Sequence, residues 1–99
     1  MEKCEKSYND NEIHMGLLNE IHQTYIKKNN DYGNSFGKSI DKFGYTAALV
    51  RMEDKLNRLE SLLIGNNDQK VNDESVIDTC LDLANYSIML SMENMKRSK

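Results

Sequence analysis

The chain contains no proline in 99 residues and only five glycines. Proline breaks helix interiors and glycine weakens them, so long stretches of this sequence meet no local obstacle to helix formation. Apolar residues recur every three or four positions in the segments 11–28, 46–65 and 73–95, which is the spacing of one face of an α-helix. The sequence therefore predicts an all-α fold, a small helical bundle of three main helices.

A glycine-rich segment, residues 29–45, follows the first predicted helix. Gly33, Gly37 and Gly44 interrupt any helical period there, and the neighbouring Asn and Asp residues are typical of turns. We expect this segment to be a loop with about one helical turn.

The last predicted helix is apolar over more than half of its circumference. Its central stripe consists of Ile77, Leu81, Ala84, Ile88, Met92 and Met95. A chain of this length is too small to bury so wide a surface by itself, and soluble monomers rarely leave such a surface exposed. We therefore expect a homo-oligomer.

Length and charge limit the remaining possibilities. The size fits one domain, residues 1–99, in which the polar residues 1–10 form a flexible N-terminal tail. A net charge of −3 and a pI near 5.3 argue against binding to duplex nucleic acid, whose phosphates favour a basic protein face. No apolar run approaches the ~18 residues of a membrane span. We expect a cytoplasmic protein with no membrane contact.

Three carboxylates repeat at intervals of four residues on the last predicted helix: Glu74, Asp78 and Asp82. This spacing places them on one stripe, where like charges repel. The second helix carries a basic flank beside its leucine seam, formed by Arg51, Lys55 and Arg58. Two antiparallel helices can bring the acidic stripe and the basic flank together.

Two interpretations of these charges stay open. In the first, Arg51 and Arg58 form ion pairs with the aspartates across the helix interface, which contribute little net stability. In the second, the three carboxylates and Asp54 hold Mg²⁺, which prefers oxygen ligands, and the basic flank binds phosphate groups. Residue spacing alone does not decide between them.

The segment DYGNSF offers a second set of ligand contacts. It combines backbone amides at a flexible glycine with hydroxyl groups and two aromatic rings on which a base can stack. The alternative is an ordinary turn whose rings close the end of the core. We take the candidate ligand-binding residues to be Asp31, Tyr32, Ser35, Phe36, Arg51, Lys55, Arg58, Asn85 and Tyr86.

Three blocks of this sequence resemble a small phage and bacterial family described as nucleotide-modification-associated, which has no settled function. The blocks are KNNDYGNSF, GYTAALVRMEDKLNRLESL and DESVIDTCLDLANYSIM, and the resemblance spans roughly residues 25 to 92. That family is similar in turn to the MazG-like nucleoside triphosphate pyrophosphatases, which are all-α and often form dimers or tetramers. The resemblance implies a single MazG-like helical domain with a nucleotide ligand.

The sequence departs from the enzyme pattern that this resemblance implies. In MazG-like enzymes an ExxE pair and an ExxD pair on successive helices hold Mg²⁺ for attack on a phosphate linkage. Here Glu53, Glu60 and Glu74 are each followed three residues later by an aliphatic residue. Hydrolysis needs a placed metal and water, whereas binding needs only complementary contacts. We therefore assign no catalytic residue.

Three functions remain open at this point. The first is a phage-encoded anti-defence sponge, which sequesters a nucleotide or nucleotide-derived immune signal and needs no cofactor to bind it. The second is a Mg²⁺-dependent pyrophosphatase acting on modified or noncanonical nucleotides. The third is a helical interaction module without a ligand. The missing acidic pairs favour the first, so we expect the partners to be a small nucleotide and further copies of this chain.

Overall fold

The computed structural model describes residues 9–65 and 73–98, and of residues 73 and 74 the backbone alone. Within these ranges the chain forms four helices and no strand: α1 (Asp10–Tyr32), α2 (Ser35–Phe43), α3 (Thr46–Leu63) and α4 (Asp73–Arg97). The predicted all-α class is confirmed. Residues 1–8 of the predicted tail lie outside the described residues, whereas Asn9 caps α1 by accepting a hydrogen bond from the Glu12 amide at 2.9 Å.

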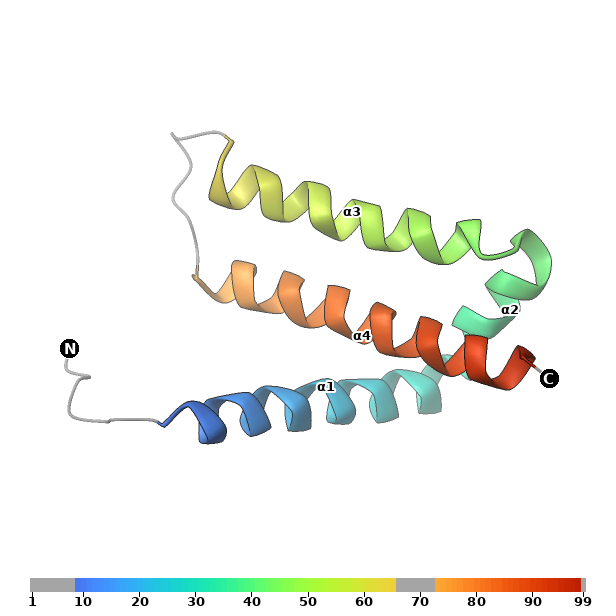
Figure 1. The fold of residues 1–99 in the computed structure, drawn as a ribbon, viewed down its shortest axis with the longest axis horizontal. Coiled ribbons are helices and arrows are strands. Elements are labelled where there is room, and N and C mark those ends of the chain that lie inside the picture. Colours follow the sequence, from blue (N-terminus) through green and yellow to red (C-terminus); the bar gives the residue numbers. More distant parts are fainter. Residues whose placement is uncertain (1–8, 66–72, 99) are drawn as a thin grey trace.

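α4 lies between α1 and α3 (Figure 1). α3 runs antiparallel to α4 and forms the most extensive helix–helix interface, whereas α1 runs in the same direction as α4. α2 connects α1 to α3 beside the C-terminal end of α4. The short helix therefore closes the end of the bundle at which three longer helices meet.

The segment 29–45 differs from its predicted loop. α1 continues to Tyr32, and α2 is a helix of nine residues. Gly33 and Gly44 have φ angles of 65° and 76°, a left-handed region that favours glycine, and they end α1 and α2. Between them Asn34 caps α2, because its side-chain oxygen accepts a hydrogen bond from the Gly37 amide at 3.0 Å.

The buried core lies where α2, α3 and α4 meet. Phe36 and Ile40 are one helical turn apart on α2, so both point to the same side, and they pack with Ala48 of α3. Tyr86, Met89 and Leu90 of α4 cover this cluster. Apolar residues four positions apart therefore make the expected loop an amphipathic helix, because folding there buries two large side chains.

Large apolar side chains remain on the surface of every helix. In α1, which is described throughout, Ile21 is the one buried residue, while Ile13, Met15, Leu17, Leu18 and Ile26 are exposed. Phe43 of α2, Leu56 of α3 and Ile77 of α4 are exposed as well. In the described ranges no helix has both the length and the apolarity to cross a membrane.

An ionic cluster around the buried Glu93 ties the end of α4 to α2. Glu93 is only 5% exposed, and one of its carboxylate oxygens accepts hydrogen bonds from Arg97 at 2.9 and 3.0 Å. Arg97 also pairs with Asp41 of α2 at 2.9 Å and donates to the Gly37 carbonyl at 3.2 Å. The second oxygen of Glu93 lies 3.1 Å from the Lys96 ammonium.

This cluster keeps Glu93 ionised. Burial by itself raises the pKa of Glu93, but hydrogen bonds from Lys96, Arg97 and Asn34 outweigh it and leave the pKa below its ordinary value of 4.5. Hydrogen bonds to Asp41 and Glu93 raise the pKa of Arg97. The attachment of α4 to α2 therefore depends on a carboxylate that must stay charged.

We expect the fold to weaken in acid through Glu93. Because its folded-state pKa is lowered, its ionised form stabilises the protein above the ordinary pKa, and this stability is lost as the pH falls through the lowered value. Urea unfolding midpoints of the wild type should fall as the pH drops below the ordinary pKa of 4.5, and those of Glu93→Gln should fall less. Glu60→Gln, the same change at an exposed position of α3, should keep the wild-type dependence. An identical acid response in the wild type and Glu93→Gln would contradict this account.

Candidate functional site

A cavity of about 310 Å³ opens where the C-terminal third of α1 faces the other helices. Its lining comes from all four helices, and its size lies at the lower end of the ~300–1,000 Å³ of small-molecule pockets. Six of the predicted ligand-binding residues line it: Tyr32, Ser35, Phe36, Arg51, Asn85 and Tyr86. The structure thus brings together candidates from three separate parts of the sequence, residues 32–36, 51 and 85–86.

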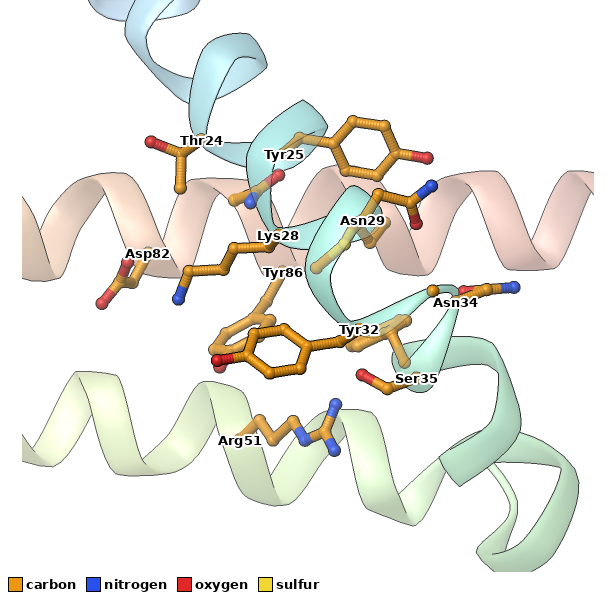
Figure 2. A pocket seen from close by; sticks show the side chains of 14 residues that line it. Thr24, Tyr25, Lys28, Asn29, Tyr32, Asn34, Ser35, Arg51, Asp82 and Tyr86 are labelled. Carbon is orange, nitrogen blue, oxygen red and sulfur yellow. The ribbon is translucent and has the colours of Figure 1, made fainter.

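Aromatic rings form the floor and the rim of the cavity. The rings of Phe36 and Tyr86 stack, with centroids 6.0 Å apart and an interplanar angle of 14°. Tyr32, at the end of α1, is 67% exposed, and Figure 2 shows its ring at the open side of the cavity. A planar ligand can therefore lie against rings that the core holds in place.

Arg51 is the cation of the cavity whose position is fixed. Its guanidinium donates a hydrogen bond to the Ser39 hydroxyl at 2.9 Å and lies 5.6 Å from the centroid of the Phe36 ring. It extends from α3 toward the segment that carries Tyr32 and Ser35 (Figure 2). Among the described side chains, the ion pairs belong to Lys55, Lys96 and Arg97. The charge of Arg51 is therefore not neutralised by a described carboxylate and is available to an anion.

Lys28 is a second cation in the lining, and sequence reasoning missed it. Its side chain extends from α1 toward Asp82 (Figure 2). Thr24, Tyr25 and Asn29 belong to the same face of α1, because they are spaced three and four residues from Lys28 and Tyr32. The helical spacing could have revealed this face, but only if the first helix was extended beyond residue 28.

The two opposed flanks of α3 and α4 form one ion pair in the described residues. Lys55 pairs with Asp82 at 3.3 Å. Arg58 donates to the Thr79 hydroxyl at 3.3 Å, and Thr79 in turn donates to the Ser75 carbonyl. An ion pair between the two helices therefore forms, as one interpretation predicts, but Lys55 makes it and not Arg51 or Arg58.

The candidate metal ligands do not converge within the described residues. Asp54 is exposed on α3, while Asp78 and Asp82 line a neighbouring cavity of about 240 Å³. No group of three His, Cys, Asp or Glu side chains suited to a metal ion is found among the residues that the structure describes. The side chain of Glu74 lies outside them, so the complete set stays a prediction.

Three of the predicted ligand-binding residues lie elsewhere. Asp31 is exposed on α1 and is absent from the lining. Lys55 and Arg58 are also absent from the lining. On α3 they lie further from α2 than Arg51 does, and they contact Asp82 and Thr79 of α4 instead.

Comparison with protein families identifies the chain. The family model described as nucleotide modification associated domain 1 matches residues 28–93, which carry every cavity residue except Thr24 and Tyr25. Comparisons with curated proteins and with solved structures find no match. Because the matched segment covers about two thirds of the 99 residues, the protein belongs to the nucleotide modification associated domain 1 family.

Proposed function

We propose that the cavity binds a nucleotide, with its phosphate on Arg51 and Lys28. The supporting observation is Arg51, whose guanidinium is oriented by a neutral hydroxyl and an aromatic ring and is not neutralised by any described carboxylate. Guanidinium groups bind phosphate through paired hydrogen bonds. The adjoining rings of Phe36 and Tyr86 supply an apolar wall for the rest of the ligand.

The protein, in this proposal, holds its ligand without converting it. Asp82 is the one carboxylate in the lining of the described cavity, and its pairing with Lys55 supports a structural role. Recognition by cations, amides and rings needs no cofactor, so Mg²⁺ is optional for binding. A phage-encoded protein of this kind would sequester a nucleotide or nucleotide-derived immune signal and so act against host defence.

The proposed active form is a homo-oligomer. α1 attaches to the rest of the chain through a face on which Ile21 is buried, while the side chains of Ile13 and Leu17 remain 45% and 38% exposed. These two residues are one turn apart and form a continuous apolar strip. A second copy of the chain is the partner that we propose for this strip, since an isologous contact covers both strips at once.

Replacing Arg51 by Ala should weaken nucleotide binding by about 1–3 kcal/mol, because a charge-assisted hydrogen bond to phosphate is lost. Isothermal titration with a panel of 5′-nucleotides measures the effect, and circular dichroism checks the fold. Arg58→Ala is the matched control: it makes the same change on the same helix, but its side chain contacts Thr79 outside the cavity. Equal losses in the two variants, or no loss in Arg51→Ala, would count against the proposed phosphate site.

Bound nucleotide should be recovered unchanged. The protein is incubated with the same nucleotide panel, once with Mg²⁺ and once with EDTA, and the ligand released by heating is identified by mass spectrometry. We expect the intact nucleotide in similar amounts under both conditions, since the proposed contacts involve no metal. A monophosphate and pyrophosphate that form only with Mg²⁺, and that disappear in Asp78→Asn, would establish a pyrophosphatase instead.

Light scattering coupled to gel filtration should give a mass above that of one 11.4 kDa chain. Leu17→Glu should reduce the measured mass, because it places a charge in the apolar strip of α1. Gln23→Glu introduces the same charge at an exposed polar position of the same helix and should leave the mass unchanged. A wild-type monomer at tens of micromolar (~10–100 µM) would contradict the proposed homo-oligomer.

A further inference from the structure

A second, smaller cavity adjoins the proposed nucleotide site. It has a volume of about 200 Å³ and shares Tyr25, Asn29, Asn34, Phe36 and Met89 with the larger cavity. Its own residues are Met92, Glu93 and Lys96 of α4. The space equals that of about seven water molecules, which is enough for one nucleobase but too small for a whole nucleotide.

The walls of this second cavity suit a flat ring system. The aromatic rings of Tyr25 and Phe36 belong to the lining, together with the thioethers of Met89 and Met92. Aromatic rings stack on a base, and methionine sulfur makes favourable contacts with ring edges. Because Phe36 lines both cavities, a ligand can extend from Arg51 past this ring into the smaller space.

The polar groups of the second cavity define the edge of the ring that they can bind. Glu93 is an ionised carboxylate and accepts hydrogen bonds, whereas Lys96, three residues later, only donates them. Guanine presents two adjacent donors, N1–H and N2–H₂, beside the acceptor O6. Adenine places an unprotonated N1 beside its amino group, so a second acceptor would face the carboxylate.

Glu93 can accept hydrogen bonds from such an edge if the base replaces existing partners on one of its oxygens. A carboxylate accepts about four hydrogen bonds. One oxygen of Glu93 is occupied by Arg97, while the other receives Lys96 and a long contact from the Asn34 amide at 3.4 Å. The two donors of a base would therefore take the places of both contacts on this second oxygen: the Asn34 amide, whose 3.4 Å contact is the weakest, and Lys96, whose side chain is 56% exposed.

We propose that the ligand is a guanine nucleotide, with its base in the second cavity against Glu93 and Lys96 and its phosphate at Arg51 and Lys28. This assignment rests on the proposed nucleotide-binding function and adds the identity of the base. Glu93 then has two roles, since the same carboxylate ties α4 to α2 through Arg97. Selectivity for guanine follows because the ion pair with Arg97 holds the Glu93 carboxylate, an acceptor, beside the Lys96 ammonium, a donor.

The test compares three probes that differ only in the base edge: the 5′-monophosphates of guanosine, inosine and adenosine. Inosine keeps N1–H and O6 but lacks the amino group. Isothermal titration of the wild type should give binding that weakens roughly tenfold from guanosine to inosine monophosphate and further to adenosine monophosphate, as expected for hydrogen bonds to a charged group. Equal binding of all three would overturn the guanine assignment and leave nucleotide binding intact.

Two variants then separate base recognition from stability. Glu93→Gln keeps the shape but replaces an acceptor by a donor, so the preference for guanosine over adenosine monophosphate should disappear. Asp41→Asn removes the other carboxylate partner of Arg97 outside both cavities and should retain the preference. Loss of preference in Asp41→Asn would overturn direct recognition by Glu93. If Glu93→Gln does not fold, the order in which the wild type binds the three monophosphates decides the guanine assignment. If the wild type binds none of the three, the proposed nucleotide-binding function is rejected as well.

Discussion

The burial of Phe36 between α3 and α4 is the contact on which the rest of the structure depends. A helix of nine residues is too short to be stable alone in water, so α2 exists because Phe36 and Ile40 pack against Ala48 and the residues of α4 around Tyr86. The same Phe36 ring stacks with Tyr86 and supports the Arg51 guanidinium. The packing of Phe36 therefore forms the core and the cavity together.

The residue that each cation contacts shows whether its charge is compensated within the protein or remains available to a ligand. Lys55 and Arg97 each face a carboxylate, Asp82 and Glu93 respectively, so their charges are compensated within the protein. Arg51 is held by the hydroxyl of Ser39, which orients the guanidinium without cancelling its charge. A neutral partner of this kind lets a cation keep its position and still bind an anion strongly.

The small core connects stability to binding. The buried apolar residues of the described chain are Ile21, Phe36, Ile40 and Ala48, and the last three form one cluster in which Phe36 also lines the cavity. Any ligand or further subunit that binds the folded state alone shifts the equilibrium toward it by mass action. In a chain with so little buried surface, occupancy of the site and persistence of the fold are expected to rise together.

The sequence by itself determined the three long helices and the residues at which α3 and α4 begin. Absence of proline and a three-to-four-residue apolar period specify long helices, and Gly33 and Gly44 mark two boundaries because only glycine readily adopts their positive φ angles. The segment between these glycines was misjudged as a loop, since the burial that makes it helical comes from α3 and α4. The sequence analysis also ends the first helix before Tyr32, and so does not identify the face that Lys28 shares with Tyr32.

Only the tertiary structure decided which cation serves the site. Arg51, Lys55 and Arg58 follow one another at helical spacing on one flank of α3, and nothing in that spacing ranks them. The antiparallel register of α4 places Asp82 at Lys55 and Thr79 at Arg58, whereas the position of α2 places Ser39 and Phe36 at Arg51. The sequence determined the charges, and the packing of α2 and α4 determined their partners, because partners remote in sequence meet only after the helices have docked.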